Sequence, residues 1–184
     1  MKRIRILLPV LTVLTLSACE DFLDRQPYDF IGTDAFYKTT ADIEGAVNGC
    51  YNSFHEIINS GQFFLTENRS DNAKYEPTRS AGSKPDERSF SILSVMPTNT
   101  YIADYRAACY HSIARCNLVL SNIDVVNDDV LKSRLSAESK FIRAVVYFNL
   151  ARLFDGVPLI TEPITGEEAA NIGRATVDAV YAQI

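Results

Sequence analysis

Few side chains in this sequence have the types and spacing that chemistry requires. Its two histidines, His55 and His111, are far apart, and there is no G-x-S-x-G, no H-E-x-x-H and no glycine-rich phosphate loop. Glu67 and Asp71 lie close together in a polar stretch, and a pair of carboxylates can hydrolyse a glycosidic bond. Hydrogen bonding within a loop explains these two acids better. The sequence therefore predicts neither an enzyme nor a cofactor.

Three of the four cysteines fall within apolar patterns. Cys109 and Cys116 are seven residues apart on an expected helix, so their Cα atoms lie roughly 10 Å apart, too far for a disulfide between them. His111 is about 200° around that helix from Cys109, so the three residues do not converge on a metal. We expect buried thiols and no metal site. A disulfide from Cys50 to Cys109 or Cys116 stays open if the protein is exported.

The remaining cysteine, Cys19, follows a segment that is typical of an export signal. Lys2, Arg3 and Arg5 precede ten mostly apolar residues, Leu7–Leu16, which are too few for a membrane span of roughly 20 residues. The sequence Leu-Ser-Ala-Cys that follows resembles the lipobox of bacterial lipoproteins. This predicts a signal peptide over 1–18 and acyl chains, palmitate among them, on Cys19 as a membrane anchor. The alternative is an ordinary secretory signal with a chance cysteine.

Acidic residues follow the expected cleavage site at once. Glu20, Asp21 and Asp24 resemble the surface-export signal of Bacteroidota lipoproteins. This resemblance implies an anchor in the outer membrane with the protein facing the cell exterior. The alternative is that these acids merely begin the mature chain.

The charge of the chain argues against a nucleic-acid partner. The formal net charge of the 184 residues is −5, and it becomes −8 when the three basic residues of 1–18 are removed. Non-specific binding to nucleic acid requires clustered lysine and arginine, which this chain lacks. A hydrophobic content of 47% and a charged content of 22% are ordinary for a globular domain.

Apolar residues at spacings of three and four predict several helices and no strand of note. We expect helices over about 40–59, 99–123 and 130–154, and a fourth that begins after Thr176. The turn at 127–129 is short, so the second and third helices should form an antiparallel hairpin. Gly45 and Gly49 suggest a close helix–helix approach beside the first stripe. No cap, glycine or proline closes the fourth helix before Ile184, which indicates a fragment of a longer chain.

The longest apolar stretch, Ala137–Pro158, should form the centre of the fold. One face of it carries Phe141, Ala144, Val145, Phe148 and Ala151, and a second apolar run covers much of the remainder. Such a helix is expected to be packed on several sides. We expect it to stop at Asp155-Gly156, with Gly156 as a left-handed cap and Pro158 preventing continuation.

Two segments lack a clear period. Residues 62–99 contain three prolines and many polar residues, and we expect a long surface loop with brief pieces at Phe63–Leu65 and Phe90–Met96. Residues 19–38 contain too many aromatic and aliphatic groups for a free tether, so parts of this segment should lie on the domain. The predicted organisation is a signal over 1–18, a lipidated lead-in over 19–38 and a helical domain over 39–184.

Four stretches together resemble one family, the SusD-like (RagB/SusD) outer-membrane lipoproteins. The stretch Leu16–Asp24 looks like the mature start of these proteins, and Ala114–Ile123 contains an R-x-N pattern like that of a family helix. The stretch Ala137–Pro158 is the closest match, and Arg174–Tyr181 resembles the start of the next helix. The resemblance implies an all-α fold of tetratricopeptide-like helix pairs with long inserted loops. It also implies that a C-terminal portion is missing here.

The resemblance further implies a function in nutrient uptake. SusD-like proteins bind nutrient oligomers, usually glycans, without cleaving them, and deliver them to a SusC-like TonB-dependent transporter. Sugars are recognised by aromatic faces together with amides and carboxylates. The chain has no tryptophan, so the candidate ligand-binding residues are Tyr75, Asn99 and Tyr101, in or beside the long loop. Two alternatives stay open: a helical scaffold that docks the transporter without a ligand site of its own, and a surface glycosidase.

Overall fold

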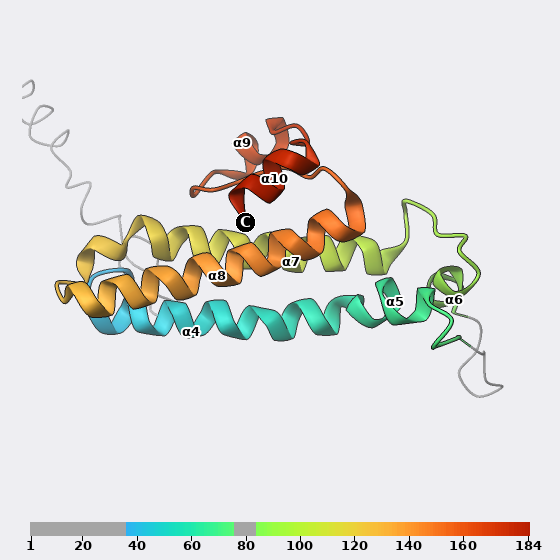
Figure 1. Cartoon of the computed structure of the whole chain (residues 1–184), viewed down its shortest axis with the longest axis horizontal. Coiled ribbons are helices and arrows are strands. Elements are labelled where there is room, and N and C mark those ends of the chain that lie inside the picture. Colours follow the sequence, from blue (N-terminus) through green and yellow to red (C-terminus); the bar gives the residue numbers. More distant parts are fainter. Residues whose placement is uncertain (1–35, 76–83) are drawn as a thin grey trace, which may run out of the picture. The chain divides into compact units, whose positions relative to one another are not determined.

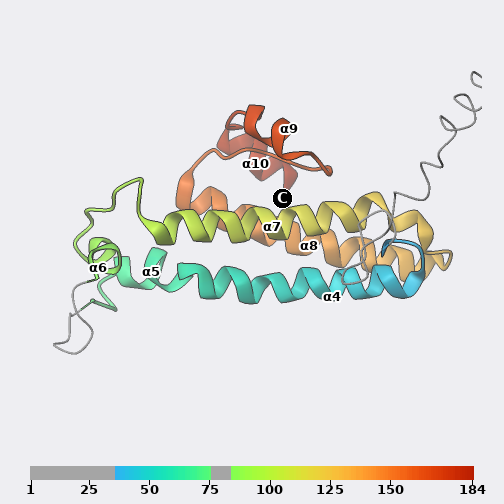
Figure 2. The same cartoon turned by 180° about the vertical axis from the view of Figure 1, so that it is seen from behind.

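A computed structural model describes residues 36–75 and 84–184, and every element in these ranges is helical. The signal over 1–18, Cys19 and most of the lead-in lie outside the described residues. Three long helices lie side by side: α4 (Thr40–Ile57), α7 (Thr100–Ser121) and α8 (Asp129–Phe154) (Figure 1, with the reverse view in Figure 2). The expected all-α fold is confirmed. No helix in the described ranges has both the length and the hydropathy needed to cross a membrane.

The first long helix begins where the sequence predicts. The Thr39 hydroxyl accepts from the Asp42 backbone N–H, and the Asp42 carboxylate accepts from the Thr39 N–H at 2.8 Å, which forms a capping box. Those hydrogen bonds lower the pKa of Asp42. The expected close approach at Gly45 and Gly49 is wrong, because a Cβ at either glycine would meet nothing within 4 Å. Both glycines lie away from the neighbouring helices.

The chain turns sharply after α4. A π-helical segment, η1 (Ile58–Gln62), contains Gly61 at φ +107°, and the Tyr101 ring lies against this glycine. A Cβ there would be 2.7 Å from Tyr101 Cδ1, so both the conformation and the space require glycine. Two single turns follow, α5 (Phe63–Leu65) and η2 (Glu67–Arg69). Glu67 and Asp71, the pair of acids considered for glycoside hydrolysis, are both exposed.

The second and third helices form the expected hairpin. Asn99 caps α7 by accepting from the Tyr101 N–H, and Asp128 caps α8 by accepting from Val130 and Leu131. One 3₁₀ turn, η3 (Ile123–Val125), lies between the two helices. The connection is short, so α8 runs back along α7.

Two apolar clusters fill the bundle, and a pair of buried serines separates them. One cluster lies where α4 and α8 begin and α7 ends, and contains Ile43, Val47, Cys50, Cys116, Val119, Val126, Leu135 and Ile142. The other lies towards the opposite end and contains Ile57, Leu65, Phe90, Tyr105, Ile113, Val146, Leu150, Val157 and Val180, among others. Between them the Ser53 and Ser112 hydroxyl oxygens are 2.5 Å apart, both fully buried. Since each serine hydroxyl has a hydrogen-bond partner, neither is an unsatisfied buried polar group.

The buried face of α8 differs from the expected one. Ile142, Val146 and Leu150 face α4 and α7, whereas Phe141 is 63% exposed and Phe148 is 40% exposed. The prediction that this face is packed is therefore wrong at Phe141 and Phe148, whereas Ala151 of the same face is buried. The second apolar run occupies the side towards α4 and α7, and α10 also contacts α8, where the rings of Phe148 and Tyr181 have centroids 6.4 Å apart.

The end of α8 also differs in detail. Asp155, not Gly156, adopts the positive φ of 64°. Gly156 is required for another reason, because a Cβ there would lie 2.2 Å from the Ala175 carbonyl oxygen. Arg174 donates to the carbonyl oxygens of Gly156 and Phe154, both at 2.6 Å, and satisfies the helix end. The helix stops at the predicted place, but the prediction of Gly156 as the left-handed residue is wrong.

Three short helices complete the described chain. The sequence did not predict α6 (Pro85–Ser91) or α9 (Gly166–Asn171), whereas α10 (Val177–Gln183) begins after Thr176 as expected. A capping box of Thr165 and Glu168 begins α9. In Figure 1, α9 and α10 lie on one side of the bundle, and Val180 of α10 is fully buried in the second cluster.

Candidate functional site

Polar contacts hold the short helix α6 to the segments that precede and follow it. Asn68 is 2% exposed and donates to the Glu87 carbonyl oxygen at 3.1 Å, while Ser91 donates to the Asn68 amide oxygen at 3.0 Å. The Asp86 carboxylate accepts from the Thr100 N–H and hydroxyl, and these bonds lower the pKa of Asp86. The short helix is thus tied to both η2 and α7.

A buried carboxylate completes this support. Glu87 is 6% exposed and accepts from Lys84 at 2.9 Å and from the Tyr101 hydroxyl at 2.5 Å. Burial opposes the charge of Glu87, but the two donors outweigh it and its pKa lies below the ordinary value. The same hydrogen bond is the largest reason why the pKa of Tyr101 rises to about 12.

The C-terminal end of α6 is unusual for its residue type. Leu93 has φ +54° and lies where a helix normally has glycine. The Leu93 N–H donates to the Phe90 carbonyl at 3.2 Å, and the Ser94 N–H donates to the Ser89 carbonyl at 2.9 Å. This is a Schellman motif with a leucine in the left-handed position. Leu93 is 70% exposed, so the strain is not offset by burial.

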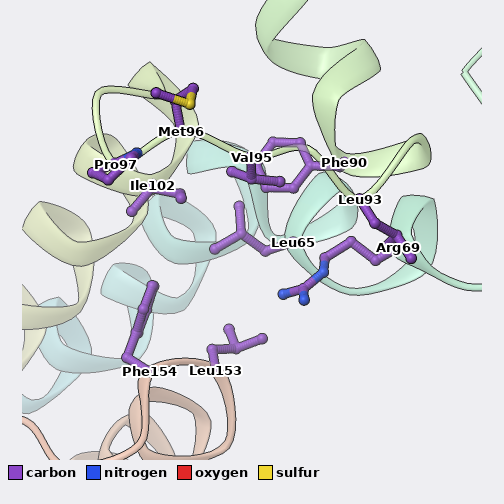
Figure 3. Close-up of a pocket in the computed structure, with 10 residues that line it drawn as sticks. All are labelled: Leu65, Arg69, Phe90, Leu93, Val95, Met96, Pro97, Ile102, Leu153 and Phe154. Atoms are coloured by element: carbon purple, nitrogen blue, oxygen red, sulfur yellow. The ribbon is translucent and has the colours of Figure 1, made fainter.

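Next to α6 is a pocket of about 370 Å³ at the end of the bundle, shown in Figure 3. The elements α5, η2, α6, α7 and α8 and the loop after α6 supply its walls. The lining residues are Leu65, Arg69, Phe90, Leu93, Val95, Met96, Pro97, Ile102, Leu153 and Phe154. Figure 3 shows the Arg69 guanidinium reaching in among apolar side chains. The arrangement suits a mainly apolar group that also has a hydrogen-bond acceptor.

The three residues that the sequence singled out lie around α6 rather than in this pocket. Asn99 is 2% exposed and, besides capping α7, donates to the Asp86 carbonyl and to Ser89, both at 3.0 Å. The Tyr101 ring packs on Phe64 with centroids 4.7 Å apart. The Tyr75 N–H donates to Ser91, and the Tyr75 hydroxyl is buried with no hydrogen-bond partner among the residues that the structure describes. The structure therefore gives Asn99 and Tyr101 supporting contacts, and ligand binding by the three stays a prediction.

The sequence did not predict the pocket, because its walls come from elements that are separate in the chain. Proline at position 85 and the acids Asp86 and Glu87 are a helix-start signal that would have found α6. Nothing in the sequence shows that Leu65, Ile102 and Phe154 meet, because they come from three separate elements.

Cys50, Cys109 and Cys116 are free thiols and fully buried, and no cluster of potential metal ligands occurs within the described ranges. The neighbouring Cys50 thiol on α4 and burial both raise the pKa of the Cys116 thiol on α7. Burial raises the pKa of Cys109 to about 12. All three contribute to packing, as their apolar neighbours predict.

Comparison with known proteins gives consistent matches. The sequence model of a SusD-like family, described as starch-binding associating with outer membrane, matches residues 21–184. SusD-like protein P25 of Formosa agariphila is 29% identical over 192 residues, and SusD-like protein P2 of the same organism is 30% identical over 185. These alignments cover 100% and 98% of this chain but 36% of each relative. The chain thus spans about a third of the length of these curated relatives.

Solved structures match in the same way. A laminarin-binding SusD-like protein has a TM-score of 0.68 and 27% identity, over 80% of this chain and 32% of that one. A SusD-like protein from Bacteroides fragilis also has a TM-score of 0.68, with 26% identity over 86% of this chain and 30% of that one. Both are SusD-like, as is the family whose sequence model matches, so the comparisons of sequence and of structure agree.

Proposed function

Because the chain belongs to the SusD-like family, we propose that the whole protein binds nutrient oligomers, above all glycans, at the cell surface and delivers them to a TonB-dependent transporter. The match of the family model to residues 21–184 carries this proposal. The laminarin-binding relative supports a glycan as the ligand. We propose binding without cleavage, which the starch-binding description of the matching family supports.

The pocket beside α6 is our candidate surface for contact with such a ligand. Its apolar walls can accept the C–H face of a sugar ring, and Arg69 can donate to a hydroxyl oxygen. Tyr75, Asn99 and Tyr101 are kept as candidate binding residues, and they also hold α6 in place beside the pocket. Met96, 64% exposed at the rim, is the accessible residue with which to test the pocket.

Calorimetry of the full-length protein with laminarin and starch oligosaccharides tests ligand binding. Met96→Ala should weaken binding several-fold through lost contact, which corresponds to about 1 kcal/mol. Val130→Ala removes an apolar side chain that is 82% exposed at the far end of α8, and it should bind like the parent protein. Equal affinities of the two variants would remove the pocket from the proposal. Recovery of a transporter without glycan binding would favour the scaffold alternative.

The anchor and location need a separate test. Cys19 is proposed to carry the lipid, with the outer membrane as the location and the exterior as the exposed side. Labelled palmitate should enter the protein in cells and should be absent from Cys19→Ala, which should leave the membrane fraction. Protease treatment of intact cells should digest the anchored protein. Protection in intact cells with digestion after lysis would contradict the surface orientation.

A further inference from the structure

A second concave surface lies beside Phe154, a residue that also lines the pocket of Figure 3. It has a volume of about 170 Å³ and is lined by Arg106, Phe154, Gly156, Val157, Pro158 and Arg174. Two of the six lining residues are arginines and none is acidic. A depression with this lining favours a ligand that combines an apolar part with an anionic group.

Hydrogen bonds hold the Arg174 guanidinium in place, and the exposed Arg106 side chain lies over an aromatic ring. Arg174 donates from Nε to the Gly156 carbonyl and from Nη2 to the Phe154 carbonyl, both at 2.6 Å, which leaves Nη1 free of these bonds. Arg106 lies over the Phe154 ring with its central carbon 5.8 Å from the centroid. A fixed guanidinium loses little entropy when it binds a carboxylate or a sulfate group.

The surface around Arg106 and Arg174 keeps a positive charge when the nearby carboxylates and the end of α8 are taken into account. Within the described parts of the chain no carboxylate forms an ion pair with Arg106 or Arg174. The end of α8 contributes about half a negative charge, which Arg174 offsets. Asp104 and Asp155 are close in sequence, but neither lines the depression. Arg106 therefore remains an uncompensated cation beside an aromatic ring.

Resting on the proposed glycan-binding function, we propose that this surface binds the carboxylate or sulfate group of an acidic glycan. The Arg106 and Arg174 guanidiniums contact the anionic group, and Phe154 and Pro158 contact the adjoining sugar ring. Bidentate hydrogen bonding to a planar guanidinium suits both kinds of anion. The ligands of the whole protein then include uronic-acid or sulfated glycans, beyond the neutral ones.

The test compares three oligosaccharides of equal length by calorimetry on the full-length protein: an oligouronate, a sulfated oligosaccharide and a neutral glucan. At least one acidic oligosaccharide should bind more tightly than the neutral one, and Arg106→Gln should weaken it roughly tenfold while leaving the neutral one unchanged. Lys140→Gln is the matched control, since it removes one exposed positive charge from α8 about 20 Å away along the helix. Circular dichroism confirms that both variants are folded.

The outcomes separate this inference from the function on which it rests. If acidic and neutral oligosaccharides bind equally, or if Arg106→Gln and Lys140→Gln have the same effect, the anion site is refuted and glycan binding stands. If no oligosaccharide binds, both proposals fail. Tight binding of the acidic oligosaccharide that Arg106→Gln alone weakens establishes the site.

Discussion

Arg143 on α8 donates from Nη1 to the Asn117 amide oxygen on α7 at 2.7 Å, and the two residues are 8% and 1% exposed. The same nitrogen donates to the Thr161 carbonyl at 2.9 Å, and Asn117 donates to the carbonyls of Ile160 and Glu162, both at 3.1 Å. Tyr147 adds two further bonds to Ile160. These hydrogen bonds attach residues 160–162 to the hairpin. Asn117, Arg143 and Tyr147 all belong to stretches that resemble the SusD-like family.

Loss of the Arg143 side chain should destabilise the protein. Arg143→Met keeps the apolar stem but leaves the buried Asn117 oxygen and the half-buried Thr161 carbonyl without their donor, which should cost about 3 kcal/mol in the free energy of unfolding. Arg134→Met is the control, because Arg134 is exposed and its ion pairs are at the surface. Urea unfolding monitored by circular dichroism gives both values. A difference between the variants under about 0.5 kcal/mol would show that the network contributes little.

Leu93 offers a stabilising change. A non-glycine residue in the left-handed region costs about 1 kcal/mol, and Leu93→Gly removes that cost while keeping the Schellman hydrogen bonds. The melting temperature should rise. Ile92→Gly, at the adjacent exposed position with φ −98°, should lower it instead. A fall for both variants would mean that Leu93 makes a contact worth more than its strain.

The parts of the fold that the sequence predicted are those with strong local signals. Thr39, Asp128 and Thr176 are caps with apolar periods behind them, and the structure has helices after each. The buried face of α8 was not predictable in the same way, because apolar residues surround most of that helix. Packing against α4 and α7, not hydrophobicity alone, selects Ile142 and Val146 over Phe141 and Phe148.

The candidate site was harder to predict for a related reason. Tyr75, Asn99 and Tyr101 were chosen because their types suit sugars, yet Asn99 and Tyr101 bond to Ser89 and Glu87 and support α6. The pocket and the Phe154 depression are assembled from residues far apart in the chain, such as Arg106 and Arg174. Residue type predicts what a side chain can bind, and only the fold decides whether it is free to bind it.

Gly156 should not tolerate a side chain. The Cβ of Gly156→Ala would lie 2.2 Å from the Ala175 carbonyl oxygen, so the segment before α10 must move and the hydrogen bonds from Arg174 must lengthen or break. Overpacking of this kind costs about 1–3 kcal/mol. Gly173→Ala is the control, since nothing lies within 4 Å of the added atom. Chemical denaturation of both variants measures the difference, and equal stability would mean that the segment yields without cost.

The hydrogen bond from Tyr101 to Glu87 should appear in the pH dependence of stability. The pKa of Tyr101 is raised to about 12 from an ordinary value near 10, so the folded state favours the protonated phenol. The stabilisation is complete below pH 10 and is lost as the pH rises towards 12, by at most about 1.4 kcal/mol per pH unit. Tyr101→Phe should have a shallower loss over this range, because one titrating phenol is gone. An unchanged slope would contradict the bond.

The three buried cysteines should be inert in the native protein. Cys50, Cys109 and Cys116 have no exposed surface, and the raised pKa values of Cys109 and Cys116 disfavour the reactive thiolate. In a Cys19→Ala background, an aromatic disulfide reagent at pH 8 should label none of them until denaturant is added, after which all three should react. Ser133→Cys, at an exposed position on α8, should react at once and serves as the positive control. Fast labelling of the parent protein would show that α4 and α7 separate readily. If only one thiol reacts after unfolding, the other two are joined as a disulfide.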